Sequence, residues 1–259
     1  MPRYKLTLEY DGTPYHGWQR QPGLPTVQGA LEDAIQKFCG VAVTLEVAGR
    51  TDKGVHATGM VCHADLPNAL PGWRVADALN ALTPRTITVL KAQRVPTTFQ
   101  ARFGCVGRHY QYLICNRRAF PALLTTAAAP RAAHIRPPLD ILKMRQAAAL
   151  LCGRHDFSSF RSRECQAKSP VTALHSIRLS KRGEVITITL HGAAFLHHMV
   201  RLMVGLLVDI GSGKRPVAAA AAVLAARDVT TCSPMVPAHG LYFTRADYAA
   251  RPTPGKTTK

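Results

Sequence analysis

The sequence predicts an α+β protein made of two ferredoxin-like βαββαβ halves, with mainly antiparallel sheets and a central cleft. Strand-like alternation and helical periodicity follow one another in the order βαββαβ, and the same order recurs in the second half of the chain. The chain has 259 residues and 47% hydrophobic residues, enough for a substantial core. We expect domains at residues 1–104 and 105–250, followed by a disordered basic tail at 251–259.

In the first half, Tyr4 to Tyr10 alternates as a strand. Thr26 then caps a helix whose apolar residues share one face, and Gly40 ends it. The elements expected next are, in order, a strand at 41–47, a turn at 49–54, a strand at 56–66, a helix at 73–82 and a strand at 86–95.

In the second half, the alternation of Val106 to Cys115 predicts a strand. Residues 121–138 are rich in alanine and proline and are expected to form a surface loop. The remaining expected elements are a helix at 139–151, a polar, basic loop region at 153–170, a hairpin of strands at 174–180 and 184–190, a long helix at 195–208, a short helix at 217–226 and a strand at 240–245.

The charge of the chain predicts a polyanionic partner. Lysine and arginine outnumber aspartate and glutamate by 33 to 15, which gives a net charge of +18 spread along the whole chain. The most apolar stretch, residues 195–210, is interrupted by His197, His198 and Arg201 and is shorter than the roughly 18 residues of a membrane span. With no signal-like N-terminus and seven cysteines without a Cys-x-x-Cys pair, we expect a cytoplasmic protein with reduced thiols.

The segment from Gly49 to Ala57 places Asp52 between the cations Arg50 and Lys53 and between two glycines. The cations would favour the ionised form of the carboxylate, and the glycines allow positive φ or a close approach to a ligand. An oriented, ionised carboxylate can act as a nucleophile. The alternative interpretation is a surface turn with a weak ion pair.

The apolar helix expected at 195–208 contains one arginine, Arg201. A buried guanidinium needs an anion, and we expect Asp52 to supply it. Backbone carbonyls, or an ordinary structural acid such as Asp209 or Asp77, are the alternatives. His197 and His198 are interpreted as packing and polar contacts, not as ligands.

On the strand at 106–115, Arg108, Tyr110 and Tyr112 share one face, while His109 and Gln111 point to the other. A cation beside aromatic rings suits a nucleobase, although alternating tyrosines can equally belong to a core. The loop that carries Lys168 is basic and polar, so we expect it to contact phosphate.

Several other motifs carry no function. Gly211 to Lys214 and Pro254 to Thr257 lack the first glycine of a phosphate-binding loop. Cys152, His155 and Cys165 could supply three zinc ligands, but a fourth is missing and the spacing matches no zinc finger.

Together, these segments resemble the TruA family of tRNA pseudouridine synthases from about Tyr4 to Tyr248. The motifs that carry the resemblance occur in the family's order: residues 10–22, Thr26-Val-Gln28, 49–57, Leu79-Asn-Ala-Leu82, Ala101-Arg-Phe103, 155–160, 165–170, 195–201, Val204-Gly205 and Gly240-Leu-Tyr242.

This resemblance implies that a homodimer isomerises uridine to pseudouridine at positions 38, 39 and 40 of the tRNA anticodon stem-loop, without metal or cofactor. Asp52 is then the expected nucleophile, with Arg201 and Arg50 as the basic residues near it. Tyr110 is expected to stack on the uracil. The other expected substrate contacts are Arg20, Lys53, Arg108 and Lys168.

Two other functions stay open at this point. A non-catalytic RNA-binding protein could use the same basic surface. A nucleosidase or glycosidase also uses a carboxylate at an anomeric carbon, but it typically needs a second carboxylate, and only Asp52 stands out here.

Overall fold

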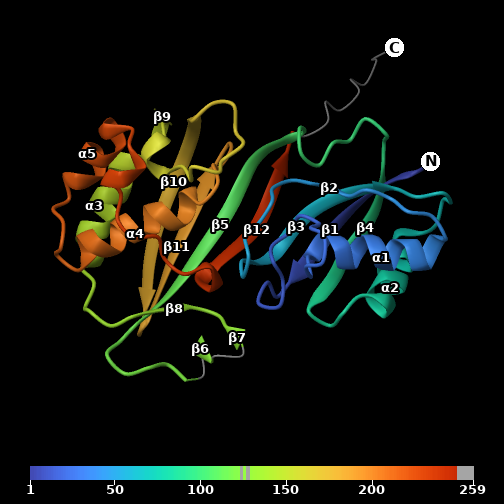
Figure 1. Cartoon of the computed structure of the whole chain (residues 1–259), viewed down its shortest axis with the longest axis horizontal. Coiled ribbons are helices and arrows are strands. Elements are labelled where there is room, and N and C mark those ends of the chain that lie inside the picture. The colour runs from blue at the N-terminus through green and yellow to red at the C-terminus, as the bar shows by residue number, and fades with distance from the viewer. Residues whose placement is uncertain (123–124, 127–128, 250–259) are drawn as a thin grey trace, which may run out of the picture.

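The computed structural model describes residues 1–122, 125–126 and 129–249, so the tail predicted at 251–259 lies outside the described residues. Its main feature is one ten-stranded sheet with the strand order β4-β1-β3-β12-β5-β11-β10-β9, on which β2 pairs with β3 and β8 with β5 (Figure 1). Most neighbouring strands are antiparallel, and helices pack on the sheet. The predicted α+β class is therefore confirmed.

The strands of this sheet are β1 (Arg3–Tyr10), β2 (Glu46–Val47), β3 (His56–Asp65), β4 (Ile87–Val95), β5 (Cys105–Asn116), β8 (Ala133–Ile135), β9 (Gly153–Asp156), β10 (Val171–Arg182), β11 (Val185–Gly192) and β12 (Leu241–Tyr248). A separate small ladder joins β6 (Thr125–Thr126) to β7 (Ala129–Pro130). The helices are α1 (Val27–Cys39), α2 (Gly72–Leu82), α3 (Ile141–Leu151), α4 (Met199–Gly211) and α5 (Ala219–Ala226).

The two halves of the chain have the same strand order. In the first half β1 lies between β4 and β3 and is antiparallel to both, while β2 continues the order beyond β3. In the second half β5 lies between β12 and β11 and is antiparallel to both, while β10 continues the order beyond β11. Each half therefore has the order fourth, first, third, second strand of a ferredoxin-like unit.

The two halves meet along a short parallel ladder between β3 and β12, in which Tyr242 pairs with His56 and Phe243 with Ala57. We call these two residue pairs the seam. β2 pairs with β3 only at Cys62 and His63, so it leaves the start of β3 available to β12. Through the seam the halves share one sheet; the domain boundary at residue 104 stays a prediction.

Side-chain alternation shows that the helices cover one face of the sheet. In β5, Tyr110, Tyr112 and Ile114 are buried, whereas the alternate residues His109, Gln111 and Leu113 are half-buried. In the first half α2 packs on β4, and in the second half α3 packs on β10 (Figure 1). The second half thus keeps a partly open sheet face opposite its helices.

The local signals for α1 are confirmed. The Thr26 hydroxyl accepts a hydrogen bond from the Gly29 amide at the start of α1, and Gly40 ends the helix with φ 74°. Asp140 caps α3 in the same way, accepting from the amides of Leu142 and Lys143. These contacts are local in sequence, which is why the pattern predicts them.

Four predicted elements need correction. The strand at 41–47 shrinks to Glu46–Val47, because the Leu45 amide donates to the Glu32 carboxylate on α1 instead of to a strand. The loop at 121–138 contains β8, whose alanine is buried against β5. The basic loop after α3 begins with β9, which pairs with β10. The long helix begins at Met199, not at residue 195.

All seven cysteines are free thiols. Among the described residues, no helix combines the length and the apolar character that crossing a bilayer requires.

Candidate active site

The loop that carries Asp52 connects β2 to β3 and rests on the segment that follows β1. The Thr51 carbonyl accepts from the Trp18 amide at 3.0 Å, and the Thr51 hydroxyl shares a 2.8 Å hydrogen bond with the Tyr10 hydroxyl. Gly17 has φ 90°, and a Cβ on it would lie 2.6 Å from the Thr51 carbonyl oxygen. The close approach therefore requires glycine at position 17.

The two glycines of the motif have different roles. Gly54 has φ 78°, which lets the chain turn directly after Asp52. Gly49 instead faces the second half of the chain, where a Cβ would lie 3.5 Å from the Phe243 ring and 3.8 Å from the Tyr110 hydroxyl. The loop is thus placed between the two halves.

Three side chains at the start of α4 lie close to the Asp52 carboxylate. Its Oδ2 lies 3.2 Å from Arg201 Nη1 and 3.5 Å from His198 Nε2, and its Oδ1 lies 3.4 Å from His197 Nε2. The predicted pairing of Arg201 with Asp52 is present, across 149 residues of sequence. Arg201 also donates from Nε to the Val236 carbonyl, which fixes the guanidinium.

The two histidines reach Asp52 because α4 starts late. His198 has φ 66°, a left-handed conformation that is uncommon outside glycine and that stops the helix from extending toward residue 195. The His197 carbonyl accepts from the Ser162 amide at 3.1 Å, outside any helix. The strained residue thus turns both imidazoles toward the carboxylate.

The electrostatics keep His198 neutral. Burial lowers the pKa of His198, and the neighbouring His197 and Arg201 lower it further, although the charge of Asp52 opposes them. A neutral imidazole can accept a proton at neutral pH. Asp52 is 22% exposed and Arg201 12%, so the pair is shielded from water but still reachable by a ligand.

Tyr110 lies on β5, next to the loop that carries Asp52. Its ring packs edge to face with Phe195 and Phe243, at centroid distances of 5.0 and 5.2 Å. Burial first, and the Asp52 charge second, raise the pKa of Tyr110, so the phenol is neutral at physiological pH. The residue is only 7% exposed, and its stacking on a base stays a prediction.

The structure does not pair the two cations flanking Asp52 with it. Within the described part of the chain, the ion pairs of Asp52 join it to Arg201, His197 and His198. Arg50 is exposed and donates to the Gln166 side chain at 3.3 Å, and its pKa is lowered by partial burial and by the charge of Arg102. Lys53 and Lys168 are exposed at the surface.

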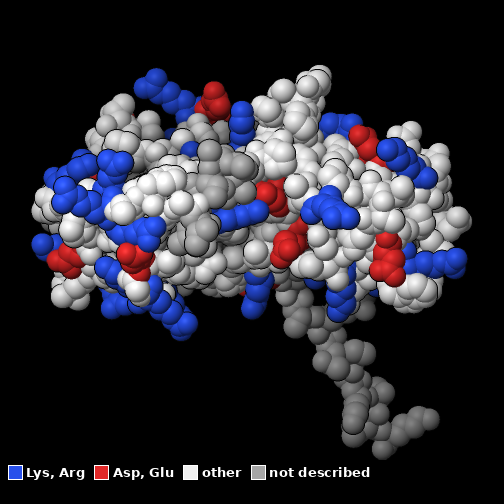
Figure 2. Space-filling view, turned by 90° about the horizontal axis from the view of Figure 1, so that it is seen from below, with Lys and Arg blue, Asp and Glu red and all other residues white. Residues whose placement is uncertain are grey.

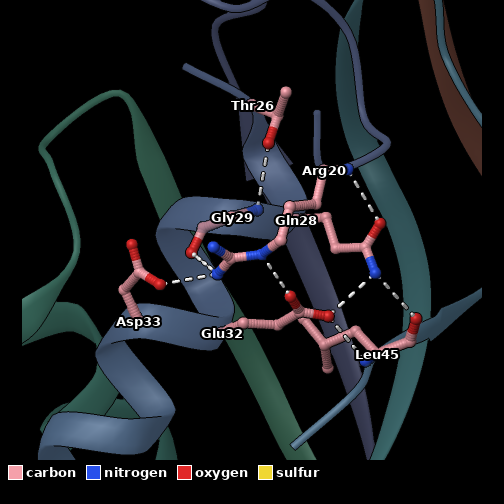
Figure 3. Close-up of polar contacts among 7 residues, drawn as sticks. All are labelled: Arg20, Thr26, Gln28, Gly29, Glu32, Asp33 and Leu45. Carbon is pink, nitrogen blue, oxygen red and sulfur yellow. Dashed lines mark hydrogen bonds and ion pairs between the residues drawn. The ribbon is translucent and has the colours of Figure 1, made fainter. Parts of the chain in front are cut away.

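Arg20, another predicted substrate contact, is engaged inside the first half (Figure 3). Its Nε donates to Glu32 at 2.7 Å, and its Nη2 donates to Asp33 at 2.6 Å and to the Gly29 carbonyl at 2.9 Å. The same Glu32 accepts from the Leu45 amide, the contact after which β2 begins (Figure 3). Arg20 is therefore tied to the first turns of α1.

Arg108 spans the two halves through backbone carbonyls. It donates from Nε to Ala48 at 2.9 Å and from Nη1 to Ala193 at 2.6 Å. Ala48 is the first residue of the loop, and Ala193 directly follows β11. Arg108 thus links the start of the loop to the end of β11.

The contact of His197 and His198 with Asp52 was not expected from the sequence, which predicts packing and polar contacts. The available signal is the spacing, since in the helix expected at 195–208 His198 would share a face with Arg201, three residues later. A left-handed residue at position 198 has no comparable signal.

Basic side chains are spread over the surface of the molecule. Figure 2 shows lysine and arginine side chains distributed over one face from end to end, with acidic groups between them. Cavities of about 570 and 450 Å³ lie where β1 starts and β4 ends, and they share no lining residue with the Asp52 cluster.

A family model described as tRNA pseudouridine synthase matches residues 7–104 and 147–249. The matched regions contain Asp52, His197, His198 and Arg201 as well as the strands of the seam.

Curated relatives match over nearly the whole chain. The tRNA pseudouridine synthase A of Afipia carboxidovorans is 50% identical over 96% of this chain and 100% of its own length. Those of Rhodopseudomonas palustris strain BisA53 and of Paramagnetospirillum magneticum are each 49% identical, over 96% of this chain and 100% and 96% of their own lengths. A solved structure, the archaeal box H/ACA sRNP Nop10-Cbf5 complex, aligns at 10% identity with a TM-score of 0.39, over 93% of this chain and 47% of that chain.

Proposed function

Since this chain belongs to the tRNA pseudouridine synthase family, we propose that Asp52 is the carboxylate that performs its reaction. The enzyme is an isomerase that converts uridine to pseudouridine in tRNA, at positions 38, 39 and 40 of the anticodon stem-loop. The observation that best supports the role of Asp52 is its 3.2 Å contact with Arg201, which brings together a carboxylate of one half and a cation of the other.

In this reaction the bond between C1′ of the ribose and N1 of uracil breaks, and a new bond forms between C1′ and C5. Asp52 can attack C1′, or it can remove the C2′ proton to give a glycal, and both routes remain open. Either route needs an ionised carboxylate held in a fixed direction. Arg201 supplies this orientation because its own position is fixed by the Val236 carbonyl.

The proton on C5 has to leave once the new bond has formed. His197 and His198 lie 3.4 and 3.5 Å from the Asp52 oxygens, and their rings are 3.9 Å apart. We assign to this imidazole pair the transfer of protons between Asp52 and solvent. The lowered pKa of His198 supports the assignment, because a neutral imidazole is the form that accepts a proton.

The remaining site residues bind the substrate in this proposal. Tyr110 contacts the uracil from below the loop, and Arg50, Lys53 and Lys168 contact phosphates at the surface. Arg20 and Arg108 contribute positive charge and hold the loop in place. The target uridine leaves its helical stack to reach Asp52, because C1′ is inaccessible within a stacked stem.

We also propose a cytoplasmic homodimer that needs no metal or cofactor for the reaction. The free thiols of the chain support a reducing compartment. Sedimentation of the purified enzyme with and without tRNA would test the dimer, and a monomer that retains full activity would disprove it.

Release of tritium from tRNA labelled at uridine C5 tests the function. Isomerisation releases tritium to water and leaves the RNA chain intact. Abasic sites would indicate a glycosidase, and retained binding without release would indicate a non-catalytic RNA-binding protein.

A further inference from the structure

Phe103 is an aromatic side chain that the protein leaves in water. It is 78% exposed, the highest value among the exposed large hydrophobic residues of the described part of the chain. The residue lies in the connection between β4 and β5. Single apolar residues at a surface are common, so exposure alone indicates no function. The backbone that carries the ring and the charges beside it distinguish this position.

The turn that carries Phe103 is held in place on both sides of the ring. Before it, the Ala101 carbonyl accepts a hydrogen bond from the Tyr248 hydroxyl at 2.9 Å. After it, the Gly104 amide donates to the Gln100 carbonyl at 3.0 Å, and a Cβ on Gly104 would lie 2.7 Å from that oxygen. The ring is thus presented on a fixed backbone, which lowers the entropy cost of binding a partner.

The same turn is joined to the loop that carries Asp52. The Arg102 carbonyl accepts from Arg108 Nη2 at 3.2 Å, and Arg108 Nε donates to the first residue of the loop at 2.9 Å. Burial first, and the charge of Arg102 second, lower the pKa of Arg50 on the loop, so the two guanidinium groups are near each other. Both arginines are exposed, and Phe103 therefore lies beside the site next to positive charge.

The chemistry of this patch suits a nucleotide. The Arg102 Cζ lies 5.2 Å from the centroid of the Phe103 ring, a cation–π contact, and the rest of the ring is open to solvent. A nucleobase with its phosphates offers a flat face for the ring and negative charge for the two arginines. A second copy of this chain would bring the same positive charges against the patch, which disfavours that partner.

We propose that Phe103 stacks on an unpaired base of the anticodon loop, while Arg50 and Arg102 contact neighbouring phosphates. The inference rests on the proposed function, because it takes the stem-loop of that function as the partner. A base of the loop has a free face for stacking, whereas a base inside the stem does not. Tyr110, at 7% exposure, stays assigned to the target uracil. Phe103 positions the RNA and takes no part in the chemistry.

Titration of the full-length Asp52→Ala protein with an anticodon stem-loop RNA tests this contact without turnover. Adding Phe103→Ala should weaken binding about tenfold, because a stacked base is lost. Phe103→Trp keeps a flat face and should bind as the parent protein does, whereas Phe103→Leu, which is apolar but not flat, should bind as weakly as Phe103→Ala. Unchanged affinity in Phe103→Ala, or full affinity in Phe103→Leu, would overturn the proposal.

Trp73 provides a matched control. It is 68% exposed on α2, which packs on β4 at the outer edge of the sheet. Trp73→Ala therefore removes an equally exposed aromatic ring away from the site and should leave RNA affinity unchanged. If Trp73→Ala weakened binding as much as Phe103→Ala does, the loss would not be specific to the patch and the proposal would be wrong.

Two further measurements separate stacking from charge. Phe103→Ala should leave the slope of log affinity against log salt unchanged, whereas Arg102→Ala should reduce it by about 1. Irradiation of complexes with stem-loops that carry 5-iodouridine at single loop positions should crosslink the RNA to Phe103, because this base reacts with an aromatic ring on which it stacks. Absence of a crosslink to Phe103 from every loop position would contradict the stacking.

Failure of this proposal can be told apart from failure of the proposed function. If Phe103 instead contacts a second copy of the chain, Phe103→Ala changes the sedimentation of the protein and keeps its RNA affinity, while tritium release still depends on Asp52. If the isomerase assignment fails, the unaltered enzyme releases no tritium, and the binding titrations still report on Phe103.

Discussion

The two halves of the molecule have the same strand order but connect their second and third strands differently. In the second half, β10 and β11 are long and are joined by two residues, with Gly183 at φ 57°. In the first half, β2 has two residues and the connection to β3 has become the eight-residue loop that carries Asp52. Shortening one strand therefore supplies both the loop that carries Asp52 and the free edge at which the seam forms.

The largest effect is expected when the acidic residue in each of the two strand connections is replaced. Asp52→Ala should lower tritium release by more than about a thousandfold, because no other carboxylate is placed to act on the ribose. Binding of tRNA should stay within a few-fold, since phosphate contacts set most of the affinity. Glu184→Ala, in the equivalent turn of the second half, is the control and should keep its rate; near-normal release by the Asp52 variant would refute the catalytic assignment.

The second test compares the helices that follow the third strand of each half. Arg201→Ala on α4 should lower the rate by about a hundredfold through loss of charge orientation. It should also lower the free energy of unfolding by about 1–3 kcal/mol, because Asp52 and the Val236 carbonyl lose a partner. Arg74→Ala, at an exposed position of α2, should change neither quantity in kinetic and urea-unfolding measurements. A normal rate and normal unfolding for the Arg201 variant would argue against the pairing.

The third test adds a methyl group at a left-handed glycine in each half. Gly17→Ala places a Cβ 2.6 Å from the Thr51 carbonyl and should displace the Asp52 loop, with about a tenfold loss of turnover and about 1–3 kcal/mol of stability. Gly183→Ala meets no atom within 4 Å and should cost only about 1 kcal/mol, at normal turnover. Equal turnover in the two variants would show that the loop tolerates movement.

The fourth test separates internal from substrate contacts of basic residues. Arg20→Ala should lower the free energy of unfolding by about 1 kcal/mol through loss of its bonds to α1, with a small effect on tRNA binding. Lys168→Ala, at an exposed position of the second half, should leave stability unchanged and reduce the slope of log affinity against log salt by about 1. The reverse result would place Arg20 on the RNA.

The smallest expected effect is on stability below pH 7, and it should be unequal between the halves. Burial lowers the pKa of His63 in the first half and of His198 and His239 in the second, below their ordinary value of 6.5. Below pH 6.5 the unfolded chain therefore binds more protons than the folded chain does. The free energy of unfolding is thus fully retained above that pH and declines below it. Hydrogen exchange at pH 7.5 and 5.5 should show the larger loss of protection around α4; a uniform loss would contradict this distribution.

The elements that the sequence predicts well depend on neighbours in the chain. Thr26 and Gly40 cap α1 as expected, because a cap contacts residues within one helical turn. The pairing of Arg201 with Asp52 was predictable for a different reason, since a buried guanidinium needs an anion and acids are scarce in this chain.

The features that the sequence does not predict depend on contacts between residues that are far apart in the chain. The Leu45 amide donates a hydrogen bond to the Glu32 carboxylate instead of to a neighbouring strand, which shortens β2. No local sequence pattern predicts that contact. The seam joins His56 to Tyr242, and the left-handed backbone at His198 follows from packing around the site. Consequently the expected site lacked the two imidazoles that lie beside the carboxylate.

The seam has a mechanical consequence. It is two residue pairs long, and one of its members, His56, follows Asp52 by only four residues. A rotation about a pivot displaces atoms in proportion to their distance from it. If the two halves bend about the seam, the outer edges at β4 and β9 swing far while Asp52 and Arg201, close to the axis, move little. Such bending would let the outer strands follow stem-loops of different shape while the spacing of Asp52 and Arg201 stayed nearly constant.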